Sequence, residues 1–595
     1  MSQSSLQACH VVNDEGTDAW VVVVGTGWGR TISADDRALT AEPILRSHGA
    51  CTMGRNDELG RNQRRGKDGR WPEETCAPAG DTCWRRYEVT RGVCERKGQD
   101  VTMTMMLEEN QAAALRHLFI DNDYTRAGVA SAVGEAGRKG LERGVGVAAE
   151  HTLGSRDDLL AQFIRLWYLH LPVPIRQLTE VPVDELCRVG ILGVEASRAR
   201  ALVSVRPIDL LDGATGWVVC DHAPGLNHDI RPTRPDHVLG ASPASMSLAQ
   251  MTMRTPVDTA LDLGCGCGVQ SLLLAGHANR VVATDVNPRA LQMAALATQL
   301  SGVEDQVDLR SGSLYEPMDT RFDLIVSNPP YVMSPPEEHG ARLVYRDGGL
   351  EGDALVESVV RGAPARLNEG GALQVLANWA QVDGQPWQDR LATWVEGTGA
   401  DLWVVERDHL DVHQYIETWL TDAGLDGTPQ WRPKYDAWLD YFAQQHITGV
   451  SMGWITLTMA GRSTPDLSFE QWPWQVNQPV ADAVTAHQPG VSAALLPDEK
   501  LLASAWTLRD DVVQEQTGQP GSADPQHVVL RQREGMCRAV EVATASGGVL
   551  GACDGQLPLG VLIDTVASIL GDSPQQVREQ TLPLVRQCLR EGFLS

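Results

Sequence analysis

The chain lacks any hydrophobic run long enough to cross a membrane. No apolar stretch among its 595 residues approaches the roughly 20 residues that a membrane-spanning helix needs. The opening stretch, residues 1–16, also lacks the basic segment followed by a hydrophobic one that marks a secretory signal. From these absences we expect a cytoplasmic protein.

Positive charge is scarce. Acidic residues outnumber basic ones by 77 to 50, which gives a formal net charge of −27. A surface of this kind repels phosphate groups, so it argues against non-specific binding to nucleic acid or to an anionic membrane. Recognition of RNA through a local basic patch stays open.

Paired cysteine motifs are missing as well. The twelve cysteines of a chain this long do not suggest a disulfide framework. Cys76, Cys83 and Cys94 lie near one another in the sequence, but they lack C-x-x-C spacing and a supporting group of histidines. We expect unpaired thiols and no metal site.

The composition is that of a globular protein with several domains. Apolar residues make up 43% and charged residues 21% of a chain that is long enough for about four domains. Changes in pattern divide it into a poorly patterned extension, an accessory α+β module, a central α/β domain, a linker or wrapping segment and a C-terminal module. The predicted boundaries are 1–102, 103–254, 255–460, 461–525 and 526–595.

The modules that flank the central domain each combine short helices with short strands. This pattern is compatible with a winged helix in both, and a cap packed on the next domain is an equal alternative for the first. The extension contains a strand-like stretch, Ala19–Gly29, that runs into glycines with poor nucleotide-site spacing. Because helical periodicity begins directly afterwards, we expect the native chain to start near Met103, Met105 or Met106.

Residues 255–460 alternate strands and helices in the manner of a doubly wound, Rossmann-like α/β domain with a parallel sheet. Seven strands are predicted, at Thr259–Leu263, Val281–Thr284, Gln306–Leu309, Phe322–Ser327, Ala372–Leu376, Leu402–Val405 and Trp454–Met459.

A glycine loop follows the first of these strands. It reads Asp-x-Gly-x-Gly-x-Gly, with the acid at Asp262 and the glycines at Gly264, Gly266 and Gly268. Glycines let the backbone turn sharply and approach a ligand closely, and the helix that follows favours an anionic group at its start. The next strand ends in Asp285, where a carboxylate would hold ribose hydroxyls.

This segment resembles the class I methyltransferases that use S-adenosylmethionine, and its spacing differs from the G-x-G-x-x-G of a dinucleotide site. The resemblance implies that Asp262 and the glycines hold the amino-acid end of the cofactor and that Asp285 binds its ribose. Ser313 stands where the family often has an acid near the adenine. The expected cofactor-binding residues are Asp262, Gly264, Cys265, Gly266, Gly268, Asp285, Val286, Ser313, Leu314 and Asn328.

The fourth strand ends in Asn328-Pro329-Pro330-Tyr331. The two prolines stiffen the turn and leave the Asn328 side-chain oxygen and the Pro329 carbonyl free to accept hydrogen bonds from one amino group. A planar nitrogen is a poor nucleophile, and two acceptors on its hydrogens can pull it towards tetrahedral geometry. Tyr331 would stack on a flat acceptor. We expect these four residues to form the catalytic set.

The tetrapeptide resembles the motif of methyltransferases that modify exocyclic nitrogens, namely nucleobase amino groups and the glutamine amide of release factors. The implied function is N-methylation of a macromolecule, for which we favour a base in RNA. The alternatives are glutamine methylation of a protein, a non-catalytic module that keeps the pocket, and a dehydrogenase, which the tetrapeptide argues against. Further along, Arg346 and Asp347 either touch the substrate or pair with each other.

Overall fold

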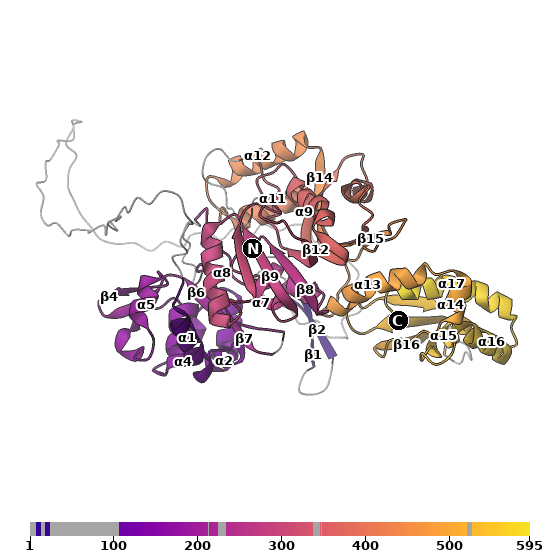
Figure 1. The fold of residues 1–595 in the computed structure, drawn as a ribbon, viewed down its shortest axis with the longest axis horizontal. Coiled ribbons are helices and arrows are strands. Elements are labelled where there is room, and N and C mark those ends of the chain that lie inside the picture. Colours follow the sequence, from indigo (N-terminus) through magenta and orange to yellow (C-terminus); the bar gives the residue numbers. More distant parts are fainter. Residues whose placement is uncertain are drawn as a thin grey trace, which may run out of the picture. The chain divides into compact units, whose positions relative to one another are not determined.

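An eight-stranded sheet is the largest element of the protein, which was examined as a computed structural model (Figure 1). The strand order is β10-β9-β8-β11-β12-β14-β13-β15. The strands are β8 (Val257–Leu263), β9 (Ala278–Asp285), β10 (Val307–Ser311), β11 (Phe322–Ser327), β12 (Leu367–Val382), β13 (Asp401–Asp411), β14 (Ile447–Thr458) and β15 (Leu467–Gln471). The structure describes residues 7–12, 18–23, 106–211, 213–223, 226, 234–336, 346, 348–520 and 526–595.

The seven predicted strands are present, and the α/β fold class is confirmed, with two differences from the expected sheet. First, β14 runs antiparallel between β12 and β13, so the sheet is mixed rather than wholly parallel. Second, β15 pairs in parallel with β13, so the segment predicted as a linker contributes an eighth strand. Neither difference could be read from periodicity, because it does not reveal which way a strand runs or what it pairs with.

The sheet reverses its winding between β8 and β11. The chain adds β9 and then β10 on one side of β8, and β11 then pairs with β8 on the other side. Ligands of open α/β sheets bind outside the carboxyl ends of the strands at such a switch point. The topology therefore places the loops after β8, β9 and β11 at one site.

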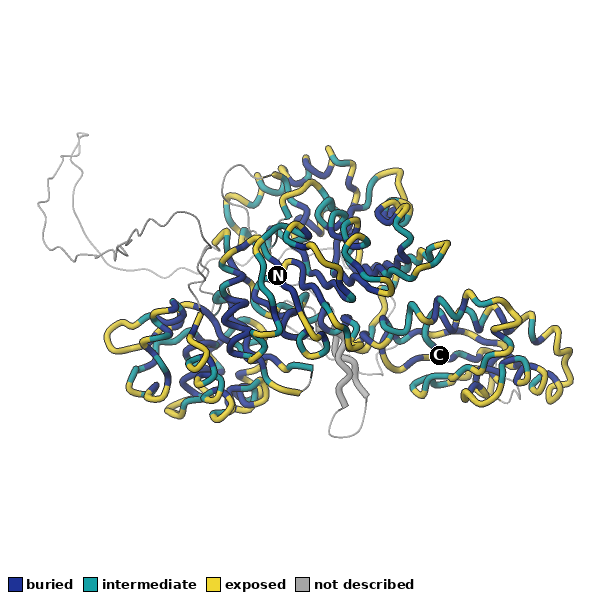
Figure 2. The backbone as a smooth tube through the Cα atoms, viewed as in Figure 1, coloured by how far each residue is buried: buried dark blue, intermediate teal, exposed yellow. Residues whose placement is uncertain are grey.

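Both faces of the sheet are buried. Leu261 belongs to one apolar cluster together with Phe322 and Trp379, whereas its neighbour Ala260 belongs to a second cluster with Trp403. Adjacent side chains of a strand point to opposite faces, so each face has its own core. In Figure 2 the strands of the central sheet are accordingly drawn mostly as buried. The helices of this region are α6 (Pro243–Met251), α7 (Val269–Leu274), α8 (Pro288–Ser301), α9 (Ala354–Gly362), α10 (Trp387–Ala392), α11 (Val412–Asp422) and α12 (Trp431–Gln444).

The accessory module is built around aromatic rings. Phe119 lies 5.1–5.4 Å, between ring centroids, from Tyr124, Phe163, Trp167 and Trp217. Its sheets are a three-stranded antiparallel one, β3-β5-β4, and the hairpin β6-β7. The elements are α1 (Glu109–Asp121), α2 (Arg126–Glu142), α3 (Val147–Leu153), α4 (Leu159–Phe163), β3 (Val173–Pro174), α5 (Val183–Arg188), β4 (Leu192–Glu195), β5 (Arg198–Ala201), β6 (Ser204–Asp209) and β7 (Thr215–Cys220). Whether this module functions as a winged helix stays a prediction.

The accessory module packs directly on α8 of the large sheet. Leu107 and Gln299 exchange two hydrogen bonds, and the Trp217 amide donates to Ser301 Oγ at 3.0 Å. Asp221, which follows β7, forms a bidentate ion pair with the Arg289 guanidinium. These contacts join the end of the module to the helix that begins at the candidate site.

The C-terminal module has its own apolar core. The predicted strand at residues 528–531 lies in β17, and the predicted helix from Leu559 to Leu570 is α16 with the same bounds. Ser573 occupies the N-cap of α17 and Pro574 its first position, although the serine side chain makes no capping hydrogen bond. The module begins within the segment predicted as a linker, because Ala494 and Leu501 belong to the same core. Its elements are α13 (Ala481–Ala494), α14 (Asp498–Ala503), β16 (Val512–Thr517), β17 (His527–Gln532), β18 (Ala539–Val542), α15 (Thr544–Gly551), α16 (Leu559–Leu570) and α17 (Pro574–Arg590).

The predicted N-terminal extension contributes an antiparallel hairpin of β1 (Gln7–Val12) and β2 (Asp18–Val23). The glycines after β2 and the three cysteines at 76, 83 and 94 lie outside the described residues. Within the described part of the chain, no helix is both long and apolar enough to span a bilayer.

Replacing Asp221 by Asn should loosen the accessory module. Burial alone raises the pKa of Asp221, but the Arg289 guanidinium and the Val238 amide outweigh it and lower the pKa below its usual value. The pair therefore stabilises the fold above about pH 4, and this stabilisation is lost as the pH falls through the lower folded pKa. Chemical denaturation at pH 7 should show a loss of about 3 kcal/mol in the free energy of unfolding.

The matched control is Glu142→Gln, which removes an exposed ion pair with Arg138. It should change the free energy of unfolding by less than about 1 kcal/mol. Equal losses in the two variants, or a loss for Asp221→Asn that does not decrease as the pH falls below about 4, would contradict the role given to Asp221.

Candidate active site

The loop after β8 turns through glycines in the left-handed region of backbone conformation. Gly264 and Gly266 have φ of 77° and 53°. A Cβ atom at either glycine would have no heavy atom within 4 Å, so it would project into open space. At Gly268, by contrast, a Cβ would lie 3.2 Å from the Ala294 Cβ. The first two glycines therefore open the loop towards a ligand, and the third lets α7 approach α8.

Asp285 ties this loop to the end of β9. Its Oδ2 accepts a hydrogen bond from the Gly266 amide and its Oδ1 one from the Asn287 amide, both at 2.8 Å. Burial raises the pKa of Asp285, and the two amides act in the opposite direction. A carboxylate holding two backbone amides still has lone pairs for hydroxyl groups of a ligand.

Asp262 lies near the end of β8 and is 1% exposed. Burial raises its pKa to about 7, although the Ser271 hydroxyl donates to Oδ2 at 2.6 Å. The Asp285 carboxylate raises the pKa further. A cationic group would stabilise the ionised form of Asp262.

A cavity of about 230 Å³ lies between these loops. Of the predicted site residues, eleven line it: Asp262, Gly264, Cys265, Gly266, Asp285, Val286, Ser313, Leu314, Asn328, Pro329 and Pro330. Gly268 and Tyr331 do not line it. The fold thus brings together residues from four separate loops, spaced over more than 60 positions of the sequence.

Part of the cavity wall comes from residues that sequence reasoning missed. Residues 237–240 together with Ser242 and Ser245 line the cavity, although the prediction assigned them to the accessory module. Ser242 caps α6, and its Oγ accepts a hydrogen bond from the Ser245 amide at 3.1 Å. The Ser-Pro pair at the start of α6 is a helix-start signal, but no sequence pattern points it at a ligand.

Asn328 directly follows β11 and lines the cavity. The Ser327 hydroxyl donates to the Leu263 carbonyl at 2.8 Å and so fixes the end of β11 against β8. The Oδ1 atom of Asn328 is buried and, within the described residues, has no hydrogen-bond partner. An unsatisfied buried carbonyl oxygen costs free energy, and a ligand that donates a hydrogen bond would satisfy it.

The glycine-rich turn after the tetrapeptide approaches it closely. A Cβ at Gly348 would lie 2.7 Å from the Pro330 carbonyl oxygen, so only glycine fits there. Arg346, in the same turn, donates to the Trp419 carbonyl at 3.2 Å and lies 3.7 Å from Asp422. Arg346 thus contacts the end of α11, and its predicted partner, Asp347, lies outside the described residues.

Tyr331 is half-buried and packs against two apolar clusters. Burial raises the pKa of its hydroxyl to about 12. The next residues are fixed as well, because the Tyr415 hydroxyl accepts a hydrogen bond from the Met333 amide at 3.0 Å. Stacking of Tyr331 on an acceptor stays a prediction.

The two cysteines of the glycine loop are packing residues. Cys265 and Cys267 are 7% and 3% exposed, and burial raises the pKa of both thiols well above the usual value. A thiol that stays protonated is a poor nucleophile and a poor metal ligand. The polar groups that the site offers to a ligand are the carboxylates of Asp262 and Asp285 and the Asn328 Oδ1 atom, which has no hydrogen-bond partner in the described part of the chain.

Parts of this chain are similar in sequence to known protein families and proteins. The family model described as "Methyltransferase small domain" matches residues 242–393, and one described as "Domain of unknown function (DUF7059)" matches residues 121–202. The ribosomal protein uL3 glutamine methyltransferase of Bradyrhizobium diazoefficiens is 31% identical over 167 residues, which cover 26% of this chain and 52% of that protein.

Two further relatives also match a part of this chain. The release factor glutamine methyltransferase of Cereibacter sphaeroides is 34% identical over 155 residues, 24% of this chain and 55% of that protein. The ribosomal RNA small subunit methyltransferase C of Erwinia tasmaniensis is 31% identical over 118 residues, 20% of this chain and 30% of that protein. The chain thus spans about half the length, or less, of these curated relatives. The match over residues 242–393 is to the family described as the methyltransferase small domain, and it agrees with the resemblance of the glycine loop and the Asn-Pro-Pro-Tyr motif to class I methyltransferases.

Proposed function

We propose that the protein transfers a methyl group from S-adenosylmethionine to a planar exocyclic nitrogen of a macromolecule. The observation that carries this proposal is the Asn328 Oδ1 atom, which is buried beside the cavity and has no hydrogen-bond partner within the described residues. It offers the acceptor that an amino group needs at the end of β11.

The residues of the cavity suit the cofactor. Asp262 and the glycine loop would hold its charged amino-acid end, and Asp285 would accept hydrogen bonds from the ribose hydroxyls. Val286, Ser313 and Leu314 would surround the adenine. Gly264 and Gly266 leave open the space that a Cβ would fill. When bound, S-adenosylmethionine supplies an electrophilic methyl group on a sulfonium sulfur.

The protein's own contribution to transfer would be orientation of the amino group. Asn328 Oδ1 and the Pro329 carbonyl would each accept one of its hydrogens, which directs the nitrogen lone pair at the methyl group. These contacts strengthen as the nitrogen becomes tetrahedral, so they stabilise the transition state more than the bound substrate. No general base is required, because the methylated nitrogen is acidic and its proton can leave to the same acceptors or to water.

For the acceptor we favour a base in RNA. The three-stranded sheet β3-β5-β4 of the accessory module exposes Arg198 and Arg200 on β5, which offer two guanidinium groups to a phosphate backbone on an otherwise acidic chain. Glutamine methylation of a protein is the second candidate, because the net charge of −27 opposes RNA binding elsewhere and two of the relatives are glutamine methyltransferases.

Asp285→Ala should weaken cofactor binding. The variant loses a charge-assisted contact to the ribose worth roughly 1.5 to 3 kcal/mol, so the dissociation constant measured by calorimetry should rise about 10-fold to 150-fold. Asp305→Ala, which removes an exposed carboxylate outside the cavity, is the control and should bind normally. Unchanged affinity in Asp285→Ala would remove Asp285 from the site.

Cofactor affinity should also fall as the pH decreases through about 7. The pKa of Asp262 is raised to about 7, so between pH 8 and pH 6 the carboxylate gains a proton and loses its attraction for the cofactor's ammonium group. The dissociation constant should rise about tenfold over that interval. Asp262→Asn should bind weakly with a flatter pH profile, and parallel profiles for the two proteins would contradict the assignment.

Asn328→Ala should abolish turnover while leaving cofactor affinity within a few-fold of the wild type. Loss of a preorganised polar contact in the transition state typically costs about 100-fold to 1000-fold in rate. Extract from a strain that lacks the protein is incubated with labelled cofactor and enzyme, and RNA is then separated from protein. Label in RNA supports the favoured acceptor, and label in protein supports the second.

Asn328→Asp keeps an acceptor oxygen and should retain some activity, whereas Asn110→Ala, at an exposed position, should retain all of it. Near-normal labelling by Asn328→Ala would remove the main support for a planar nitrogen as the acceptor.

A further inference from the structure

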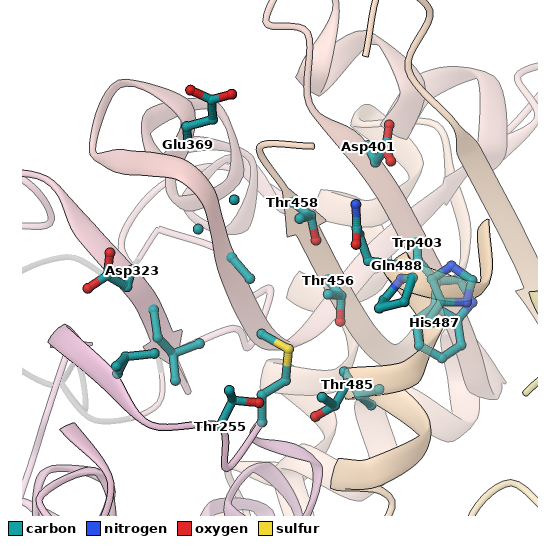
Figure 3. A pocket seen from close by; sticks show the side chains of 18 of the residues that line it. Thr255, Asp323, Glu369, Asp401, Trp403, Thr456, Thr458, Thr485, His487 and Gln488 are labelled. Carbon is teal, nitrogen blue, oxygen red and sulfur yellow. The ribbon is translucent and has the colours of Figure 1, made fainter. Parts of the chain in front are cut away.

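A second and larger cavity, of about 560 Å³, lies at the amino ends of the parallel strands of the sheet (Figure 3). It is lined where β8, β11, β12 and β13 begin and where the antiparallel β14 ends, and residues 484–491 of α13 form another wall. The candidate active site lies at the other ends of β8 and β11, so the two cavities are separate. Nothing in the proposed methyl transfer uses the second one.

One side of this cavity is lined by carboxylates. Asp258, Asp323 and Glu369 line it, and within the described residues none of them forms an ion pair. Asp323 accepts hydrogen bonds from the Thr259 amide and hydroxyl and from Asn368, all of them uncharged groups.

Two further lining carboxylates are already neutralised. Asp401 pairs with Arg462 at 2.6 Å, and Asp466 pairs with Arg590 at 2.8 Å. No lysine or arginine is among the described residues that line the cavity. The cavity is therefore rich in acceptors and carries a net negative charge that its own walls leave uncompensated.

Hydroxyl groups continue the row of acceptors across the cavity. In Figure 3, Thr456 and Thr458 of β14 lie between the acids Asp323 and Glu369 on one side and the ring pair Trp403 and His487 on the other. Thr456 lines the cavity, and it is only 8% exposed. A hydroxyl at the wall of a cavity can accept a hydrogen bond from a ligand bound there.

The aromatic end adds no positive charge. The His487 ring stacks on Trp403 with centroids 3.8 Å apart and an interplanar angle of 11°. Burial lowers the pKa of His487 to about 4, so the imidazole is neutral at pH 7. The ring pair therefore offers a flat, uncharged surface next to the hydroxyl groups.

The carboxylates are spread along the cavity rather than gathered at one point. Within the described part of the chain, no group of three or more His, Cys, Asp or Glu side chains is placed to hold a metal ion. Separated acceptors suit an extended ligand that carries several N–H donors. We propose that this cavity binds a small organic cation of the polyamine or guanidine class, with its charge towards Asp323 and Glu369 and its body along Thr456.

The test measures binding of agmatine and of spermidine to the full chain by calorimetry, with hexane-1,6-diol as a neutral molecule of similar length. The wild type should bind at least one of the amines, the diol should not bind, and the bound amine should raise the melting temperature. Saturation with S-adenosylhomocysteine should leave the affinity for the amine unchanged, because the two cavities lie at opposite ends of the strands.

Three variants locate the amine. Glu369→Lys reverses an exposed charge at the rim and should weaken amine binding about tenfold. Thr456→Val removes the buried hydroxyl at nearly constant volume and should weaken it about threefold. Glu396→Lys reverses an exposed charge outside the cavity and should have no effect, which controls for net charge.

Circular dichroism and cofactor affinity show whether each variant is folded. The proposal is overturned if neither amine binds the wild type at 10 mM, a level about tenfold above a weak dissociation constant of 1 mM. It is also overturned if S-adenosylhomocysteine displaces the amine, or if folded Glu369→Lys and Thr456→Val bind the amine as tightly as Glu396→Lys.

Discussion

The site depends on one carboxylate that holds two loops together. The Asp285 carboxylate accepts hydrogen bonds from the Gly266 and Asn287 amides. A single side chain therefore fixes both the glycine loop after β8 and the start of α8 after β9. Without it, the glycine loop would lose a partner and its freedom of conformation would oppose an ordered pocket. The same carboxylate faces the cavity, so the group that organises the site is also available to bind.

Rigid packing around α8 extends this order outwards. This helix begins close to Asp285, and its Arg289 forms an ion pair with Asp221. At its last residue, the Ser301 hydroxyl oxygen accepts a hydrogen bond from the Trp217 amide. The accessory module is therefore joined to the helix that borders the cavity, and residues 237–245 reach from the module to the cavity wall. Under the proposed function, a module placed in this way would orient the macromolecular substrate with respect to Asn328.

The cavities at the carboxyl ends and at the amino ends of the parallel strands are lined by different chemical groups. At the carboxyl ends, buried carboxylates and a free amide oxygen meet over glycines that leave the backbone open. At the amino ends, carboxylates such as Asp323 and hydroxyls such as Thr456 line a larger space closed by α13. Loops gather at the carboxyl ends because the parallel strands all end there, whereas the second cavity lies between the amino ends of these strands, the end of the antiparallel β14 and α13.

Local sequence patterns were enough to predict seven strands, the glycine loop, Asp285 at a strand end and the Asn-Pro-Pro-Tyr tetrapeptide that contains Asn328. These are local because strand periodicity, glycine spacing and proline stiffness act over a few residues. The tertiary structure alone decided the direction of β14, the pairing of β15, the wall at residues 237–245 and the second cavity. It also buried Tyr331 beside two clusters rather than in the cavity. Each of these depends on contacts between segments far apart in the chain, and no local pattern encodes such contacts.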